Sequence, residues 1–302
     1  MKKFVLKVLL FFACIVVMDL AFGLLFSYLR AHAKGGSTAN CEYIANRCQD
    51  DIIILGSSRA THHYIPQIIE DSLGMSCYNC GEEGNGIVLA FGRLSMLLER
   101  YSPKLILYEI TPGYDYGTND LDSKYLGYLR PYYKKKGISR IFDDFDDDLS
   151  FLKMKSSMYQ NTSRVLPDLL DNIVYRDNRK GFEPLYGRLD TTDIRINNNY
   201  TFGDIDSLKL SYLKQLIVET KCRGIPVIFM ISPRYCKYID LSSYEPALAL
   251  CASYNVPVYN FINYKSISDN EVYFQDLGHM NSDGATAYTQ LLIKDVLKTV
   301  LQ

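Results

Sequence analysis

The sequence predicts an α/β protein, a three-layer sandwich with about five parallel strands that is preceded by an N-terminal transmembrane helix. Two observations lead to this fold class. Short apolar runs alternate with longer segments of helical periodicity, which is the pattern of a parallel sheet covered by helices. Near its N-terminus the chain also has a long apolar segment with a single charge. With 48% hydrophobic and 22% charged residues, the composition is that of a folding chain.

Residues 1–34 are expected to form a membrane anchor and a short stalk. Between Val8 and Leu29 the only charged residue is Asp19, and a helix of this length crosses about 30 Å of hydrocarbon at about 1.5 Å per residue. A cleaved signal peptide is the alternative, because Ala-His-Ala at 31–33 resembles a cleavage site. Asp19 is either a tolerated lone acid or a contact with a partner helix. The residues that predict a cytoplasmic N-terminus and an extracytoplasmic body are Lys2, Lys3 and Lys7.

The first half of the body predicts three strands separated by two helices. The apolar runs at 51–55, 75–79 and 104–110 are expected as strands. Helical periodicity covers 65–73 and 87–101. Strands with so few polar residues are typical of a parallel sheet that is buried on both faces.

The second half repeats this alternation and adds two strands. Helices are expected over 207–222, 244–254 and 283–300, and strands over 227–231 and 256–261. The two halves together therefore predict five parallel strands with helices on both faces.

Between the halves lies a Tyr-rich stretch at about 114–206 that breaks the alternation. Residues 177–204 within it are polar and lack apolar periodicity, so they predict a long loop. We interpret 114–206 as a large insertion in a single domain that extends over 35–302. An insertion of this size beside a parallel sheet is suited to covering a substrate site.

Charge and histidine content restrict the possible functions. The net charge of −1 lacks the basic excess of nucleic-acid binders, so no nucleic-acid partner is expected. An imidazole is available at few positions, because the chain has four histidines: His32, His62, His63 and His279. We expect His62 and His63 to be half-exposed side chains of the helix that follows the first strand, with lining of the site mouth as the alternative.

The cysteines predict neither a metal centre nor a complete set of disulfide bonds. Seven of the eight lie beyond the apolar segment, and an odd number leaves at least one unpaired within the chain. Cys41 and Cys48 are close enough in sequence to close a small loop. Cys77 and Cys80 form a C-x-x-C pair, but a structural zinc site commonly needs a second pair, which the sequence lacks. Buried thiols are therefore expected there.

Three segments carry residues suited to acyl transfer. Ser58, in Gly56-Ser57-Ser58, follows the first strand at the edge of the sheet where open α/β folds bind ligands. Asp276 and His279 precede the last helix, and a serine nucleophile needs an imidazole base that is oriented by a carboxylate. Gly84 follows the second strand, and a glycine amide can approach a reacting oxygen closely. Taken singly, these residues also fit a helix cap, a surface turn and a loop.

Together, the three segments resemble the blocks of the SGNH (GDSL-like) hydrolase superfamily. The resemblance covers about 45–115 and 205–302 and implies a flavodoxin-like fold. Ser58 matches the family's nucleophile, and Ser57 replaces its Asp. Gly84 matches the oxyanion glycine. Asp276 and His279 match the D-x-x-H block.

One block departs from the family pattern. The family has an Asn directly after the third strand as a side-chain oxyanion donor, and this chain lacks an Asn there. Asn119, in the Gly-Thr-Asn-Asp string at 117–120, is either a displaced equivalent or a coincidence. The resemblance implies an oxyanion hole formed by the amides of Ser58 and Gly84, with Asn119 as a further donor.

The sequence therefore predicts a membrane-anchored, single-pass serine esterase whose catalytic domain faces the periplasm or the cell surface. Its catalytic residues are Ser58, Asp276 and His279, and the mechanism needs no metal or cofactor. The expected substrate is a small-molecule or glycan acyl ester, and the resemblance implies acyl groups of cell-envelope glycans or related esters for an anchored member of the family that faces outward. The alternatives are an O-acyltransferase that uses the same site and a non-enzymatic SGNH-like binding or assembly module. An enzyme requires Ser58 Oγ to lie within hydrogen-bond reach of a ring nitrogen of His279.

Overall fold

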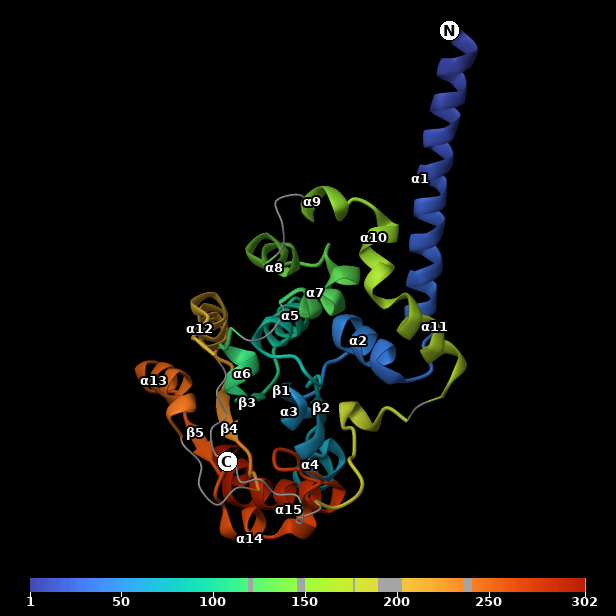
Figure 1. Cartoon of the computed structure of the whole chain (residues 1–302). Helices are drawn as coiled ribbons and strands as arrows, with labels where there is room; N and C mark the ends of the chain where they lie inside the picture. Colours follow the sequence, from blue (N-terminus) through green and yellow to red (C-terminus); the bar gives the residue numbers. More distant parts are fainter. Residues whose placement is uncertain (119–121, 146–149, 176, 190–202, 236–240, 302) are drawn as a thin grey trace. The chain divides into compact units, whose positions relative to one another are not determined.

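The chain divides into two compact units. The computed structural model describes residues 1–118, 122–145, 150–175, 177–189, 203–235 and 241–301 (Figure 1). Unit 1 comprises Met1–Arg47 and Asp122–Asn178, and unit 2 comprises Cys48–Leu121 and Arg179–Gln302.

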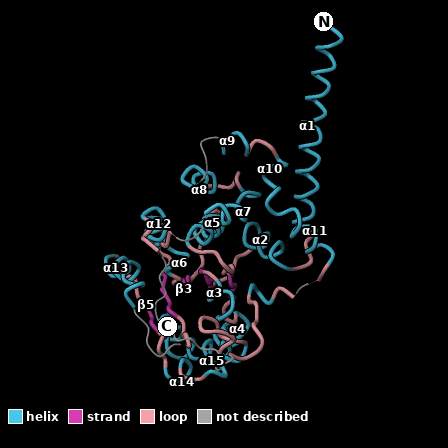
Figure 2. Tube along the Cα trace, viewed as in Figure 1, coloured by secondary structure: helices cyan, strands magenta, loops and turns pink. Residues whose placement is uncertain are grey.

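Unit 2 contains a parallel sheet, as the sequence predicts. The described residues form a five-stranded sheet in the order β2-β1-β3-β4-β5, and every pair of neighbouring strands is parallel. This order is that of flavodoxin-like doubly wound proteins. Figure 2 shows strands in magenta among the helices in cyan. The strands are β1 (Ile52–Gly56), β2 (Cys77–Asn79), β3 (Leu105–Glu109), β4 (Val227–Ile231) and β5 (Val258–Asn260).

Helices of unit 2 form a layer on each side of the sheet. Helix α15 packs against α3 and α4, whereas α5 packs against α12, and Figure 1 shows the strands between these two groups. The α-helices are α3 (Ser58–His63), α4 (Pro66–Leu73), α5 (Ile87–Leu98), α6 (Pro112–Asp115), α12 (Ser207–Cys222), α13 (Glu245–Ser253), α14 (Lys265–Ser268), α15 (Ser282–Leu292) and α16 (Lys298–Val300). The predicted three-layer α/β sandwich is thus confirmed.

The core of unit 2 lies around the three central strands. All residues of β1, β3 and β4 are buried, which explains why these strands are nearly continuous apolar runs in the sequence. Because parallel strands end at the same edge, the segments that follow β1, β3 and β4 are brought together there.

The described part of unit 1 is helical. Its helices are α1 (Lys2–Ala31), α2 (Gly36–Asn46), α7 (Asp122–Leu129), α8 (Ile138–Phe145), α9 (Ser150–Lys153), α10 (Ser157–Asn161) and α11 (Val165–Ile173). Helix α1 is long and apolar enough to cross a membrane, with a mean hydropathy of 2.7 in its most apolar window. The predicted insertion therefore contributes five helices, α7 to α11, to the described part of this unit.

The cysteines agree with the sequence analysis in part. Cys77 and Cys80 are buried, as predicted. The loop closure considered for Cys41 and Cys48 is not formed, because Cys48 retains a thiol whose Sγ donates to Asp50 Oδ2 at 3.2 Å.

Candidate active site

The turn between β1 and α3 exposes one serine hydroxyl to the edge of the sheet. Gly56 has a φ of +139°, and a Cβ at this position would lie 2.8 Å from the carbonyl oxygen of Glu109. Only glycine accommodates this turn without strain. Ser57 caps α3 by accepting the Ser58 amide proton at 2.5 Å. Ser58 is therefore held as the first residue of the helix, with 8% of its surface exposed.

A tight loop before α15 carries the predicted acid and imidazole. Asp276 Oδ1 accepts the amide protons of Gly278 at 2.7 Å and His279 at 2.8 Å. The same carboxylate lies 2.9 Å from His279 Nδ1 through its Oδ2. A carboxylate only accepts hydrogen bonds, so Nδ1 carries the proton and Nε2 is left as an acceptor.

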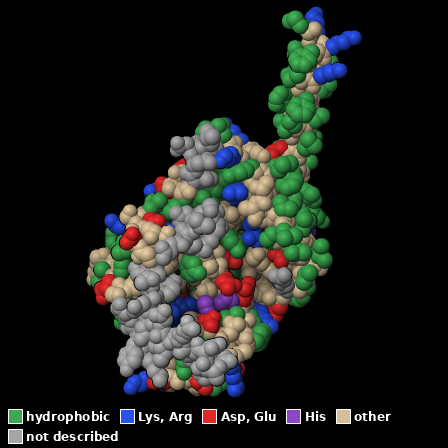
Figure 3. Space-filling model, in the orientation of Figure 1, with side chains coloured by type: hydrophobic (Ala, Val, Ile, Leu, Met, Phe, Trp, Pro, Cys, Tyr) green, Lys and Arg blue, Asp and Glu red, His purple; other side chains and the backbone are tan. Residues whose placement is uncertain are grey.

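The imidazole reaches the serine. His279 Nε2 lies 2.8 Å from Ser58 Oγ, across a sequence separation of 221 residues. Because Nε2 is an acceptor, the Ser58 hydroxyl donates to it, which is the geometry of a serine activated by a general base. The side chain of His279 is 29% exposed and that of Asp276 is 54% exposed. Figure 3 shows histidine side chains at the molecular surface next to acidic ones, so the site is open to solvent.

The environment of Asp276 favours its ionised form. Partial burial tends to raise the pKa of this carboxyl, but hydrogen bonds from His279 and Gly278 outweigh that effect and lower the pKa below its usual value. Asp276 is thus a carboxylate that fixes the tautomer of His279 and stabilises its protonated form.

Gly84 lies in the loop that follows β2. Its φ of +65° is in the left-handed region, which glycine adopts without strain. Two residues earlier in this loop, the Glu82 amide donates to the carbonyl of Gly56 at 3.2 Å. The loop after β2 therefore runs beside the turn that presents Ser58. Asn119 lies outside the described residues.

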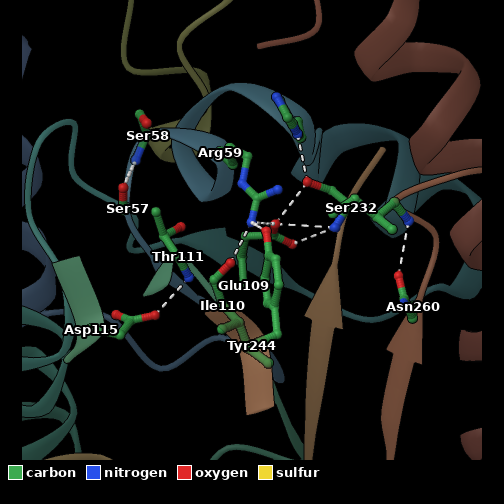
Figure 4. A network of polar contacts seen from close by, with 12 residues as sticks. Ser57, Ser58, Arg59, Glu109, Ile110, Thr111, Asp115, Ser232, Tyr244 and Asn260 are labelled. Carbon is green, nitrogen blue, oxygen red and sulfur yellow. Dashed lines mark hydrogen bonds and ion pairs between the residues drawn. The ribbon is translucent and has the colours of Figure 1, made fainter. Parts of the chain in front are cut away.

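Thr111 occupies the place directly after β3 where the sequence resemblance implies an Asn. Gly56 and Glu109 are partners in the register of β1 and β3, so Thr111 stands two residues beyond β3 just as Ser58 stands two residues beyond β1. Figure 4 shows Thr111 beside the Ser57–Ser58 turn. Its hydroxyl is buried, and none of the described residues hydrogen-bonds to it. In the sequence, only its position directly after the third predicted strand could have indicated a role for Thr111.

The expectation that His62 and His63 are half-exposed is wrong. His62 is 4% exposed and His63 is fully buried, because α3, which carries both residues, packs under the loop that carries His279. The ring centroid of His279 lies 5.9 Å from that of His62 and 6.2 Å from that of His63. His62 Nδ1 lies 2.6 Å from the carbonyl oxygen of Glu183, so it donates its proton there.

A buried chain of hydrogen bonds connects β3 to the loop of His279. The Met280 amide donates to His63 Nε2 at 3.0 Å, so His63 Nδ1 carries the proton that it donates to Ser232 Oγ at 2.8 Å. Ser232 Oγ then donates to Glu109 Oε1 at 2.7 Å. Glu109 also pairs with Arg59 at 3.0 Å, next to Ser58 (Figure 4). This chain positions His279 through the residue that follows it.

The buried imidazole in this chain gives a pH-dependent stability. Burial lowers the pKa of His63 well below its usual value, and the nearby His279 and Arg59 add to this effect. The folded protein therefore keeps His63 neutral at pH values where the unfolded chain binds a proton. Its contribution to stability is complete above about pH 6.5 and falls below it by up to about 1.4 kcal/mol per pH unit.

A His63→Gln variant lacks this titration. The difference in unfolding free energy between the wild type and the variant is expected to shrink as the pH is lowered from about 7.5 to about 5.5. Urea unfolding of both proteins at the two pH values measures this difference. A difference that stays constant would mean that folding does not lower the pKa of His63.

Among the residues that the structure describes, no group of three or more His, Cys, Asp or Glu side chains is arranged to hold a metal ion. The polar groups that meet at the sheet edge are those of the hydroxyl, imidazole and carboxylate set described above.

Comparisons with known proteins give structural likeness only. No protein-family model and no curated protein sequence matches the chain. The acetyl xylan esterase AlAXEase is similar over 81% of this chain and 99% of its own, with 12% identity and a TM-score of 0.40. A protein from Streptococcus pneumonia is similar over 91% of this chain and 97% of its own, with 12% identity and a TM-score of 0.42. A mutant of the esterase AlinE4 is similar over 84% of this chain and 98% of its own, with 11% identity and a TM-score of 0.35.

Proposed function

We propose that the chain is a serine-dependent acyl-ester hydrolase of the SGNH type. The observation that carries the proposal is the hydrogen bond of 2.8 Å between Ser58 Oγ and His279 Nε2, with the Asp276 carboxylate 2.9 Å from the other ring nitrogen. A binding or assembly module has no need of this alignment across three separate segments. The geometry therefore favours an enzyme over the non-enzymatic alternative.

The proposed reaction has two acyl-transfer steps. Ser58 Oγ attacks the ester carbonyl carbon while its proton moves to His279 Nε2, and Asp276 stabilises the imidazolium. The amides of Ser58 and Gly84 hold the developing oxyanion. The carbon–oxygen bond to the alcohol then breaks, and His279 returns the proton to that alcohol. Water, deprotonated by His279, attacks the acyl-serine and releases the acid and the free serine.

Labelling with a fluorophosphonate probe tests the nucleophile. The wild type and a Ser57→Ala variant are expected to react, whereas Ser58→Ala is not. Ser57→Ala is the matched control because it removes a neighbouring hydroxyl and costs only about 1 kcal/mol as a lost helix cap. Labelling that survives in Ser58→Ala and disappears in Ser57→Ala would assign the nucleophile to Ser57 and overturn the proposal as stated.

Water and an acceptor alcohol compete for the same acyl-serine, so an O-acyltransferase would use the same residues. Ester turnover is therefore to be compared with and without a carbohydrate acceptor. Release of free acid at a rate that does not depend on the acceptor is expected for the hydrolase. An acylated carbohydrate as the main product would assign the chain to the transferases.

Thr111 is proposed as a further oxyanion donor. Because no described group accepts its hydroxyl proton, a rotation about the Cβ–Oγ1 bond is available to direct that proton toward the substrate oxygen. Replacement by valine is expected to lower kcat about 10²-fold, as for the loss of one oxyanion donor, with little change in stability. Thr111→Ser, which keeps the hydroxyl, should retain most of the activity. Equal activity of the valine variant and the wild type would exclude this role.

The location proposed for the enzyme follows from α1. Anchored by this helix with the lysines of its first residues in the cytoplasm, unit 2 would act outside the cytoplasmic membrane. Acylated glycans of the cell envelope are the substrates proposed there. Protease treatment of intact cells tests the orientation, because a body on the outside is degraded while the cells remain closed.

A further inference from the structure

Helix α11 has its polar and apolar sides reversed relative to a helix of a soluble protein. Asp168 is fully buried and Asp171 is 3% exposed. The opposite side is apolar and exposed, with Leu166 at 65%, Leu169 and Leu170 at 41% and Ile173 at 74%. We call these four residues the α11 face. In a soluble protein the apolar stripe of a helix is the side that is covered.

Polar contacts within unit 1 hold the helix in this orientation. Asp168 Oδ1 accepts from Thr38 Oγ1 at 3.1 Å, and Asp171 Oδ2 accepts from the Thr38 amide at 3.0 Å. Arg30, in the last turn of α1, pairs with Asp168 at 3.5 Å. The buried acids of α11 are thus satisfied by α1 and α2, and the α11 face points away from them.

Helix α1 also contacts α10, through a residue in the middle of its apolar segment. Asp19 accepts from Ser156 Oγ at 2.5 Å and from the amides of Ser157 at 2.8 Å and Met158 at 2.9 Å. Asp19 is therefore not a lone acid, because it caps α10, another helix of unit 1. Backbone amides at membrane depth need such partners.

A bilayer that α1 spans would reach the level of α10. A hydrocarbon core of about 30 Å takes about 20 helical residues, so a core that starts after Lys3 or after Lys7 in either case extends past Asp19. The α11 face lies on the segment that follows α10 and adjoins α1. Figure 3 shows hydrophobic side chains covering α1 and continuing over the neighbouring surface. Further exposed apolar residues on this part of unit 1 are Phe151, Leu152, Met158, Val174 and Tyr175.

We propose that the α11 face is inserted in the membrane interface beside α1, so that unit 1 is held in the bilayer by two apolar surfaces. The proposal rests on the membrane anchoring by α1. The occupant is lipid rather than a protein, because the face is continuous with a helix whose own side chains are exposed and apolar along its length. Amphipathic helices of this kind bury their apolar side about 5–10 Å into the boundary between headgroups and acyl chains.

The absence of tryptophan from the sequence allows a direct test, because each introduced Trp is the only indole in the chain. The full chain is reconstituted in phosphatidylcholine vesicles with or without bromine atoms on the acyl chains. Leu169→Trp reports on the α11 face and Phe11→Trp on the anchor. Asn46→Trp, on an exposed polar end of α2, is the matched control within unit 1. Leu170→Trp replaces Leu169→Trp if the latter does not fold.

We expect brominated lipid to quench the emission of Phe11→Trp and Leu169→Trp and to leave that of Asn46→Trp unchanged. Quenching of Phe11→Trp without quenching of Leu169→Trp would overturn the proposal and keep the anchor; a face covered by another copy of the chain would give this result. Quenching of Leu169→Trp alone would overturn the anchor and, with it, the proposal that the α11 face inserts beside a membrane-spanning α1. Quenching of neither, or of all three variants, would overturn the proposal.

Discussion

Replacing His279 with alanine is expected to lower kcat for ester hydrolysis by about 10⁴- to 10⁶-fold, with little change in KM. The imidazole removes the Ser58 proton in the transition state. It is not expected to contribute to binding of the ground-state substrate, so KM should change little. In the wild type, His279 Nε2 lies 2.8 Å from Ser58 Oγ, and Asp276 holds the ring in place. In the alanine variant, a water molecule would have to act as the base instead. Initial rates with nitrophenyl acetate over a range of concentrations separate kcat from KM.

His62 provides the matched control for this experiment. Its ring lies 5.9 Å from that of His279, and its Nδ1 proton is engaged by the carbonyl of Glu183. His62→Gln is therefore expected to keep most of the activity. A double variant of Ser58→Ala and His279→Ala should be no slower than either single variant, because the two groups act as a unit. A His62→Gln variant as inactive as His279→Ala would mean that the base had been misassigned.

The sheet could be predicted from the sequence because its strands are defined by local composition. The run Ile52–Gly56 is buried on both faces, and no other element type explains so many consecutive apolar residues next to a turn glycine. Ser58, Asp276 and His279 could be predicted for a related reason, since each lies directly beside a predicted strand or helix end. The distances between these three side chains could be obtained only from the folded structure.

The parts that could not be predicted depend on contacts between distant segments. His63 looked like a surface residue of a short helix, and only its bonds to Ser232 and Met280 explain why it is buried and neutral. In α11 the buried side chains are the acids Asp168 and Asp171, because Thr38 and Arg30 from distant segments bind them.

Replacing Glu109 with glutamine is expected to lower the free energy of unfolding of unit 2 by about 3–5 kcal/mol, the usual cost of removing one partner of a buried ion pair. Glu109 is fully buried, and burial raises the pKa of its carboxyl while Arg59 opposes that rise. Glutamine keeps the volume and part of the hydrogen bonding. It leaves the charge of Arg59, whose side chain is 6% exposed, without a counter-ion. Urea unfolding with an unchanged slope measures the loss.

Two further variants separate the charge effect from a packing effect. Lys104 pairs with Asp51 at 3.1 Å on the surface, with 64% of the lysine side chain exposed, so Lys104→Met should cost less than about 1 kcal/mol. Adding Arg59→Met to Glu109→Gln removes the unpaired charge. The double variant is therefore expected to be more stable than the Glu109→Gln single variant.

The same substitution also tests whether this buried chain supports the site. Glu109 accepts from Ser232, which accepts from His63, which in turn accepts the proton of the Met280 amide next to His279. If the chain positions His279, the Arg59→Met and Glu109→Gln double variant recovers stability without recovering kcat, because the carboxylate that ends the chain is still missing. Recovery of both would restrict the role of Glu109 to balancing the charge of Arg59, and an unchanged stability of the single variant would mean that this charge has another partner.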